Sequence, residues 1–410
     1  MQIMAGIEYY IFYYPLAMGI AWAIGALCFF LRRERCTGRS PVTGNKLVSV
    51  IITARNEADA IESTVTSVLK SDYPCLEVIV VDDLSSDQTG ILLQSMAAAD
   101  LRVRVVHLEK NRGKPYALHC DILDGDSDIM VTIDAGASLD PLAISWLVSH
   151  FASPRVGAVT GNLRVRNRTS WLAKIQAGEY SSIIEMIKRT RLILGKVPMP
   201  PGMVVAFRRE ALVDAGLWDI AMITDSIDII WKLEKRFWDI CYEPRALCWI
   251  RVHETLKGLW CQRVGWAQGG GELFCRHRGD WTSWQQRRLL PVYLEYVTSV
   301  CWSYAYVGFT AVWLINLVMP LGLQGIKFIP EWHGSLLILV CLLQFTVALV
   351  IDRRYEQSIT RYLFWVIWYP FLYWLLIALT TVWATSKALL RKTGARPSGP
   401  VRTAGCIRTR

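Results

Sequence analysis

Two acidic residues in the segment MITDSIDIIWKL, residues 222–233, are candidates for catalysis. Asp225 and Asp228 lie between apolar side chains, just before a run with helical periodicity. A carboxylate in such a place can act as a general base, whereas the neighbouring Ser226 is neutral. The segment therefore contains either a catalytic pair or the remainder of one, and its surroundings must distinguish these interpretations.

Polar residues also follow three apolar, β-branched runs in the N-terminal half of the chain. They belong to the segments TARNE (53–57), DDLSSDQT (82–89) and DAGAS (134–138). Carboxylates just beyond a strand can hold a nucleotide, or a metal ion bound to its pyrophosphate. The alternative is helix capping, which we favour for the serines and Asp87 of the second segment. Neither GxxxxGK[ST] nor GxGxxG occurs, which argues against a P-loop ATPase and a dinucleotide-dependent enzyme.

Strands and helices alternate at short spacing between residues 48 and 134. The predicted strands are VSVIITA, LEVIVVDD, VRVVHL and DIMVTID, and the segments between them have helical apolar spacing. This alternation predicts a parallel sheet covered by helices on both faces. Ligands of such sheets bind beyond the carboxyl ends of the strands, so the polar residues at these ends are site candidates.

Apolar stretches at both ends of the chain predict membrane helices. The 410 residues are 53% hydrophobic, and a membrane span takes about 20 mainly apolar residues. Arginines directly after the first stretch place its C-terminal end, and the polar block from about residue 45 to 285, in the cytoplasm. The 11 Cys include no CxxC pair and are expected to be reduced. The four stretches are Tyr10–Leu31, Val292–Leu317, Gly334–Ile351 and Tyr362–Ala384.

The formal net charge of +10 is explained by basic residues that flank membrane segments, and no nucleic-acid-binding module accompanies it. We therefore expect no nucleic-acid partner. One anchor before the polar block and three spans after it would leave the C-terminus outside, whereas the basic tail after Ser386 favours the cytoplasm. Either the last segment, interrupted by Pro370, does not cross fully, or the tail is tolerated outside.

The order of these motifs resembles that of a known family. Strand-TARNE, strand-VDD, strand-IDAGA, TDSID and QRVGW, with membrane segments at both ends, are similar to the processive family 2 glycosyltransferases, which include cellulose, chitin and hyaluronan synthases. Segments 156–190, 206–212, 242–250, 254–263 and 341–345 most resemble bacterial poly-β-1,6-N-acetyl-D-glucosamine synthases. The resemblance covers almost the whole chain, although those synthases usually carry one more N-terminal membrane span.

This resemblance implies an α/β GT-A (Rossmann-like) cytoplasmic domain flanked by transmembrane helices, in a multi-pass protein of the bacterial inner membrane. Such an enzyme transfers N-acetylglucosamine from UDP-N-acetylglucosamine with inversion, uses Mg²⁺ or Mn²⁺, and exports a biofilm polysaccharide. The implied partners are the UDP-sugar, the growing polysaccharide, membrane lipids, a small membrane subunit and cyclic-di-GMP as regulator. The expected domains are an anchor (1–36), the GT-A domain (45–253), amphipathic interfacial helices with the QxxxW motif (254–285), transmembrane helices (290–386) and a basic tail (387–410).

The resemblance also assigns site residues by position. Three positions depart from the family pattern: Gly136 replaces the second acid of Asp-x-Asp, Ser226 the general base, and Gly265 an arginine that holds the diphosphate. Leu84 replaces a usual Gly, and Asp228 matches an acid expected to orient the following helix. The positions that match are Thr53, Asn56, Glu57, Asp83 and Lys114 for the donor, Asp134 for the metal, and Gln262, Arg263 and Trp266 for substrate binding.

The departures affect the chemistry and leave two hypotheses open. A general base contributes about 10²–10⁴ in rate, which a neutral Ser226 does not supply. Asp225 would need a backbone shift to replace it, because neighbouring side chains point in different directions. The chain is therefore either a poly-N-acetylglucosamine synthase with an altered, slow site, or a silent relative that binds UDP-sugar or acts as a scaffold in an export complex. A third, disfavoured interpretation is a lipid-linked mannosyl- or glucosyltransferase.

Overall fold

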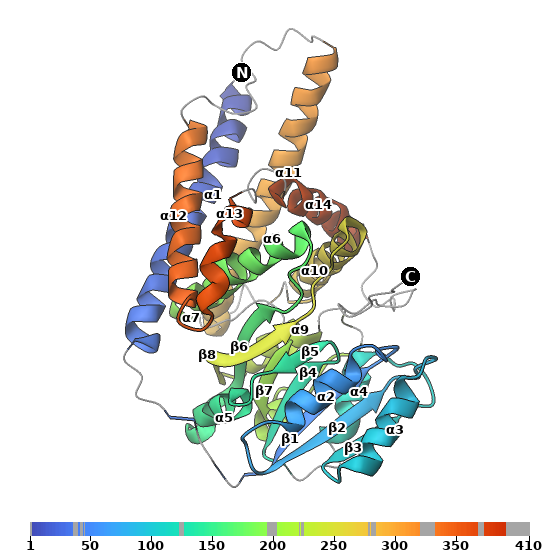
Figure 1. The fold of residues 1–410 in the computed structure, drawn as a ribbon. Helices are drawn as coiled ribbons and strands as arrows, with labels where there is room; N and C mark the ends of the chain where they lie inside the picture. Colours follow the sequence, from blue (N-terminus) through green and yellow to red (C-terminus); the bar gives the residue numbers. More distant parts are fainter. Residues whose placement is uncertain are drawn as a thin grey trace. The chain divides into compact units, whose positions relative to one another are not determined.

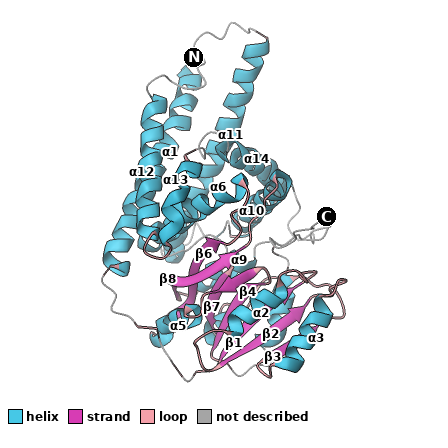
Figure 2. Ribbon diagram, in the orientation of Figure 1, coloured by secondary structure: helices cyan, strands magenta, loops and turns pink. Residues whose placement is uncertain are grey.

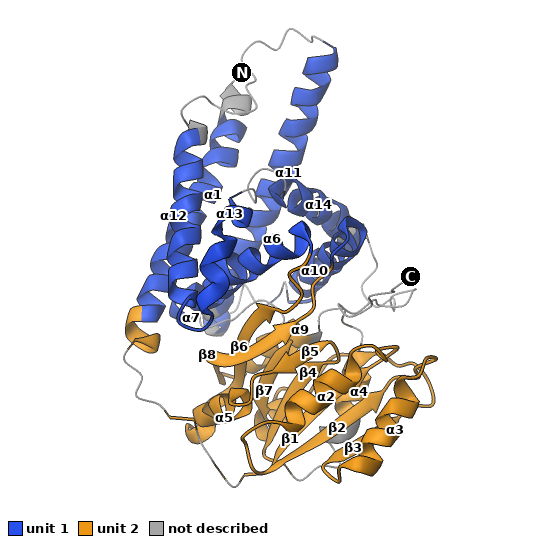
Figure 3. Ribbon diagram, viewed as in Figure 1, with its two compact units in different colours: residues 1–30, 170–195, 254–393 blue, residues 31–169, 196–253, 394–410 orange. Residues whose placement is uncertain are grey.

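A computed structural model describes most of the chain, and its contacts divide the protein into two compact units (Figure 3). Unit 1 comprises Met1–Phe30, Ser170–Gly195 and Glu254–Thr393. Unit 2 comprises Leu31–Thr169, Lys196–His253 and Gly394–Arg410. The described residues are 2–35, 40–41, 44, 46–122, 127–194, 203–220, 222, 225–277, 279, 284–319, 333–367 and 373–390.

Unit 2 contains an eight-stranded sheet in the order β3-β2-β1-β4-β7-β6-β8-β5 (Figures 1 and 2). β1, β2, β3 and β4 are the four predicted strands and run parallel, because crossover helices return the chain to the same edge. β7 is antiparallel to β4 and β6, and β5 is antiparallel to β8, so the whole sheet is mixed rather than parallel. The strands are β1 Val48–Ala54, β2 Leu76–Asp82, β3 Val103–His107, β4 Ile129–Asp134, β5 Ala137–Leu139, β6 Val156–Val165, β7 Val204–Arg208 and β8 Asp239–Ile250.

Helices pack on this sheet through apolar side chains. One buried cluster joins Ile51 of β1 and Phe207 of β7 to Leu118 of α4 and to Ile229 and Leu233 of α9. Burial of an aliphatic or aromatic side chain contributes roughly 1.5–3 kcal/mol, so this cluster holds the strand ends in fixed positions. The helices of unit 2 are α2 Ile61–Leu69, α3 Thr89–Ala99, α4 Lys114–Ile122, α5 Ala143–Val148, α8 Arg209–Asp214 and α9 Asp225–Lys235.

Strand β8 is anchored by a buried carboxylate. Glu243 accepts a hydrogen bond from His150 Nε2 at 2.9 Å and from Arg245 Nε at 2.7 Å. Burial alone would raise the pKa of Glu243, but the two basic partners outweigh burial and lower the pKa to about 2. The charged carboxylate therefore stabilises the strand that ends at Ile250, next to the candidate site.

Unit 1 is helical. A long helix follows residue 169: α6 (Trp171–Glu179) continues through a π-helical turn (Tyr180–Ile184) into α7 (Glu185–Leu194). The Ser170 side chain caps it by accepting from Ala173 N at 3.1 Å. The other helices are α1 Gln2–Phe29, α10 Leu256–Arg276, α11 Leu290–Val318, α12 His333–Asp352, α13 Leu363–Val366 and α14 Trp374–Leu390.

Three helices are long and apolar enough to span a bilayer among the described residues: Gly6–Glu34, Leu290–Val318 and Ser335–Asp352. They correspond to the first three predicted stretches. The fourth stretch contains α13 and the 17-residue α14, while Pro370 lies outside the described residues. The described residues thus give three candidate membrane spans, one before and two after the sheet domain.

The triple glycine at 269–271 packs closely within α10 and does not break the helix. A Cβ on Gly270 would lie 3.2 Å from the Tyr296 ring, and one on Gly271 would lie 3.0 Å from Ala388 Cβ. Glycine at these positions therefore lets α10 approach neighbouring helices of unit 1. The helix runs without interruption through the three glycines, from Leu256 to Arg276.

Candidate functional site

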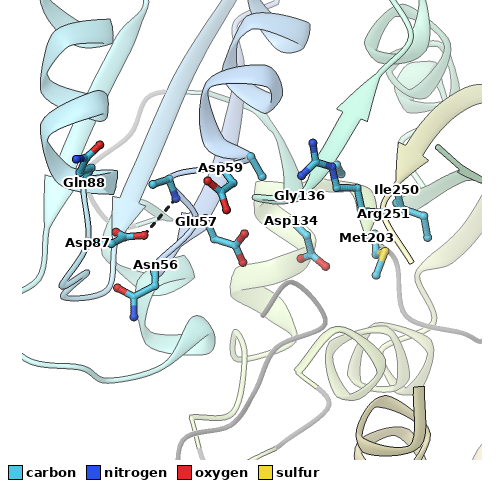
Figure 4. Close-up of a pocket in the computed structure, with 13 residues that line it drawn as sticks. Asn56, Glu57, Asp59, Asp87, Gln88, Asp134, Gly136, Met203, Ile250 and Arg251 are labelled. Carbon is cyan, nitrogen blue, oxygen red and sulfur yellow. Dashed lines mark hydrogen bonds between the residues drawn. The ribbon is translucent and has the colours of Figure 1, made fainter. Parts of the chain in front are cut away.

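A pocket of about 350 Å³ opens at the carboxyl ends of β1 and β4, where the sequence predicts a ligand site (Figure 4). The parallel register pairs Thr53 of β1 with Asp134 of β4, so the two loops that follow these strands start side by side. The residues most relevant to its chemistry are Asn56, Glu57, Asp59, Asp134, Gly136 and Arg251, and all of them belong to unit 2.

The loop after β1 is tied to the loop after β2. Asn56 Oδ1 accepts from Ser86 N at 2.8 Å, and Asn56 N donates to Ser85 Oγ at 3.0 Å. Glu57 N donates to Thr89 Oγ1 at 2.9 Å. Asn56 adopts the left-handed backbone conformation, with φ of 55°, which Asn tolerates better than most residues. These bonds fix the polar loop at the mouth of the pocket.

Helix capping is predicted for the segment after β2; the N-cap residue of α3 is Gln88, whose side chain makes no cap hydrogen bond, and the Asp87 carboxylate binds the backbone at the start of the helix. Its Oδ1 accepts from the backbone N of Thr89, the first residue of α3, at 2.9 Å. Its Oδ2 accepts from Ala58 N at 3.3 Å, the dashed bond in Figure 4. The two serines do not cap α3 through any hydrogen bond found in the described segment, and hold the loop after β1 instead.

Asp83 positions the loop that carries Lys114. The Asp83 carboxylate, which is buried, accepts from Arg112 N at 2.9 Å and from Gly113 N at 3.0 Å. Gly113 has a φ of 84°, a conformation that glycine adopts without strain. The loop leads into α4, where Lys114 Nζ lies 2.5 Å from Asp134 Oδ1. Asp83 therefore acts on the pocket through Lys114, and its predicted contact with the nucleotide stays a prediction.

Leu84 has a left-handed backbone that favours glycine. Its φ is 58°, and its side chain is 51% exposed, so little packing compensates for the unfavourable conformation. The resemblance to family 2 glycosyltransferases expected Gly here. The left-handed φ gives the physical reason for that expectation, and it makes Leu84 a strained departure beside Asp83.

The pocket is electrostatically acidic. Burial, followed by the charges of Asp134 and Asp87, raises the pKa of Glu57 to about 7, while Arg251 acts in the opposite direction. Two cations, Lys114 and Arg251, thus face a group of carboxylates. Because the acids outnumber the cations, a negatively charged ligand fits this pocket only together with a metal cation or through contact with Arg251.

The carboxylates of the pocket can hold a divalent metal ion only if a bound ligand also coordinates that ion. Within the described part of the chain, no group of three or more His, Cys, Asp or Glu side chains could hold a metal ion. Mg²⁺ is commonly held by one or two carboxylates together with substrate phosphates, and Asp134 meets that requirement. Gly136 has no side-chain ligand atom, although a Cβ there would meet nothing within 4 Å.

The acids of the TDSID segment lie in α9, apart from the described pocket lining. Asp225 is the first residue of α9, and Ser226 is half-buried. Asp228 is fully buried, and its Oδ2 lies 3.1 Å from Lys232 Nζ, one helical turn later. Neither Ser226 nor Asp228 lines the pocket as far as the structure describes it. A catalytic role for these three residues stays a prediction, and the contact of Asp228 agrees with a role in holding α9.

The residues of the Gln-x-x-Arg-Trp motif are in α10 of unit 1. Gln262 and Arg263 are buried there. Arg263 Nη2 donates to Glu179 Oε2 at 2.7 Å and to Tyr373 Oη at 3.2 Å. The Arg263 guanidinium lies 4.2 Å from the centre of the Trp266 ring. These contacts give Arg263 a positioning role toward Trp266, whereas its predicted substrate contact is not tested by them.

A Cβ on Gly265, in the same helix, would meet nothing within 4 Å in the described surroundings. The position thus has space for a longer side chain. Crowding around the backbone therefore does not explain why this position lacks the arginine of the family pattern.

The sequence interpretation missed two charged residues that line the pocket, Asp59 and Arg251. Arg251 is the one cation among the described lining residues. It directly follows β8, a strand that the apolar patterns had not identified, although WIRVH places a charge at the end of an apolar run. The same missed strand brings Ile250 into the pocket. A charged residue directly after an apolar run was the available signal.

Comparison with known proteins identifies the family and the fold of this chain. Residues 45–269 match the family described as glycosyltransferase like family 2, which is more than half of the chain. The chain therefore belongs to this family. A solved mannosyltransferase from Pyrobaculum calidifontis, in complex with GDP-Man and Mn²⁺, has a TM-score of 0.64 at 20% identity and covers 95% of this chain and 98% of that chain. This likeness confirms the predicted GT-A fold.

Two relatives with greater sequence identity to this chain are both named as synthases of the same polymer. A poly-β-1,6-N-acetyl-D-glucosamine synthase of Staphylococcus epidermidis is 36% identical over 394 residues, covering 94% of this chain and 95% of the relative. The enzyme of the same name from Staphylococcus aureus (strain MSSA476) is 37% identical over 397 residues with the same coverage. The predicted resemblance to this group is confirmed.

Proposed function

We propose that this chain is a membrane-embedded inverting glycosyltransferase that adds N-acetylglucosamine from UDP-N-acetylglucosamine to a poly-β-1,6-N-acetylglucosamine chain, at a rate reduced by its altered site. The observation that carries the proposal is the 36% identity over 94% of the chain to a synthase of that polymer. The pocket supports it, because acids at the ends of β1 and β4, which can share a metal ion with a ligand, and Arg251 after β8 suit a nucleotide diphosphate.

The reaction needs direct displacement at the anomeric carbon. The acceptor hydroxyl oxygen forms a bond to that carbon as the bond to UDP breaks, the electrons of the broken bond leave with UDP, and the hydroxyl proton goes to a base. Asn56, Glu57 and Lys114 are the proposed donor contacts, with Thr53 and Asp83 supporting their loops. Because Ser226 is neutral near pH 7, the proton transfer lacks a strong base, and the expected rate falls by about 10²–10⁴.

A divalent cation, Mg²⁺ or Mn²⁺, would be held by Asp134 together with the donor phosphates. When bound, it would neutralise charge on the departing diphosphate. Lys114 already pairs with Asp134, and Gly136 adds no second carboxylate. We therefore expect weaker metal binding than a site with two acids would give.

We propose that successive parts of the chain have different roles, based on the candidate membrane spans. Residues 45–253 transfer the sugar in the cytoplasm, residues 254–285 lie at the bilayer surface, and residues 1–36 and 290–386 form a multi-pass membrane part that guides the polymer across the bacterial inner membrane. Unit 1 supports this because it holds the apolar helices and α10 with its Trp266. A small membrane subunit and cyclic-di-GMP control belong to the same proposal.

One specific observation favours a second function. The departures at Gly136, Ser226 and Gly265 affect the metal, the base and the diphosphate together, while the loops that would hold the donor are intact. Such a chain could bind UDP-sugar without turnover and act as a scaffold subunit of a polysaccharide-export complex.

Membranes that contain the chain, incubated with Mg²⁺ and UDP-N-acetylglucosamine carrying a radiolabelled sugar, distinguish these functions. We expect slow incorporation into an insoluble polymer that requires this donor. No incorporation together with measurable UDP binding would favour the scaffold. Incorporation from a mannose or glucose donor instead would overturn the assignment of the sugar.

A further inference from the structure

Arg251 lies where the second acid of the family pattern is missing. The antiparallel register pairs Ala137 of β5 with Ile250 of β8, so Gly136 and Arg251 are the next residues outward on the two strands. Both line the pocket, and Figure 4 shows Arg251 on the same side of it as Gly136 and Asp134. Because Gly136 has no side chain, and a Cβ there would meet nothing within 4 Å, this end of the pocket has space for a guanidinium or a ligand.

Lys114, which pairs with the pocket acid Asp134, and Arg251, which lines the pocket, differ in their contacts. Lys114 Nζ is 2.5 Å from Asp134 Oδ1 and forms an ion pair with that carboxylate. Arg251 is exposed, and among the residues that the structure describes it makes no hydrogen bond and no ion pair. Arg251 and Glu57 both line the pocket, and the positive charge of Arg251 opposes the rise in the pKa of Glu57. A charged group in this position is available to a ligand.

We propose that Arg251 binds the diphosphate of the nucleotide-sugar donor. Its positive charge takes the place of the metal ion that an acid at position 136 would help to hold, and of the arginine that Gly265 replaces. This inference rests on the proposed function, because it takes the pocket to be the donor site. A guanidinium presents paired N–H donors that match phosphate oxygens in a bidentate arrangement. The diphosphate would therefore be held partly by the chain itself, and donor binding would depend less on a divalent metal.

The test compares nucleotide binding with and without the phosphates. The full-length protein in detergent is titrated with UDP and with uridine, in Mg²⁺ and in EDTA. Arg251→Leu should weaken UDP binding about 10-fold to 100-fold, the range for a charge-assisted hydrogen bond, and leave uridine binding unchanged. The wild type should still bind UDP in EDTA, whereas Arg251→Leu should lose most of that binding. Arg251→Lys should retain an intermediate affinity.

Arg155→Leu is the matched control, because Arg155 is a surface arginine of the same unit, 66% exposed and outside the pocket lining. It should not change UDP affinity. Equal UDP affinities for wild type and Arg251→Leu would overturn the inference and leave the proposed function standing. An equal loss for UDP and uridine would also overturn it, because the effect would then be structural. Failure of the wild type to bind UDP in Mg²⁺ would overturn the proposed function itself.

Discussion

Restoration of the three departing positions should recover rapid synthesis. The perturbation is the triple variant Gly136→Asp, Ser226→Asp and Gly265→Arg. At both glycines a Cβ would meet nothing within 4 Å, and neither glycine has a positive φ that would strain a new side chain. Gly265 lies within α10, where replacing glycine gains up to about 1 kcal/mol of helix propensity. The variant should therefore fold at least as well at these two sites as the unaltered chain.

The expected gain follows from the chemistry that each residue supplies. A positioned general base contributes about 10²–10⁴ in rate, and an electrostatic donor to the developing charge contributes about 10²–10³. Because residues that act together are not additive, we expect the triple variant to exceed the unaltered chain by at least about 10²-fold per molecule of protein. Ser226→Asp alone should give a smaller part of this gain.

The assay measures incorporation of radiolabelled N-acetylglucosamine into insoluble polymer, with equal amounts of protein in each membrane preparation. The matched control carries Gly136→Asn, Ser226→Asn and Gly265→Gln, which are similar in size and uncharged. The reasoning would be refuted by a triple variant that melts like the wild type and binds UDP, yet gains no rate. An equal gain in the uncharged control would refute it too, since size rather than charge would then be responsible.

Three further predictions concern stability, measured by thermal unfolding in detergent. Leu84→Gly should stabilise unit 2 by about 1 kcal/mol, because it relieves a left-handed backbone and removes an exposed side chain; a lower melting temperature would contradict this. Arg263→Leu should cost about 3–5 kcal/mol, because it removes the cation that balances the buried charge of Glu179, and adding Glu179→Gln should recover part of the loss. Glu243 has a lowered pKa, so its stabilisation is present above about pH 4.5 and is lost as pH falls toward 2; Glu243→Gln should therefore flatten the decline between pH 5 and pH 3.

The first four strands and the donor loops could be predicted because local pattern determines them. Continuous apolar runs followed by polar segments identify parallel strands and their carboxyl ends, and these loops bring Asn56, Glu57 and Asp134 together as expected. The mixed half of the sheet could not be predicted in this way. β8 alternates buried and half-buried residues around Pro244, and its pairing with β5 depends on contacts far apart in sequence. Arg251 was missed for that reason.

Roles of single residues were harder to predict than the location of the site. Asp83 and Arg263 are charged residues in family motifs, and a substrate contact was the natural expectation for both. In the structure Asp83 holds the backbone before Lys114, and Arg263 is buried between Glu179 and Trp266. Sequence position indicates that such a residue matters to the site, but only the contacts show whether it acts on a neighbour.

The departures in this chain separate donor binding from sugar transfer. The bonds that tie Asn56 and Lys114 into the pocket do not involve any of the three altered positions, so the donor side can form without them. Loss of the base at Ser226 raises the barrier of the displacement while leaving ground-state binding unchanged. With Arg251 holding the diphosphate as proposed above, such a chain should still bind UDP-sugar and turn it over slowly. Binding that is lost together with turnover would mean that the altered positions support the pocket itself.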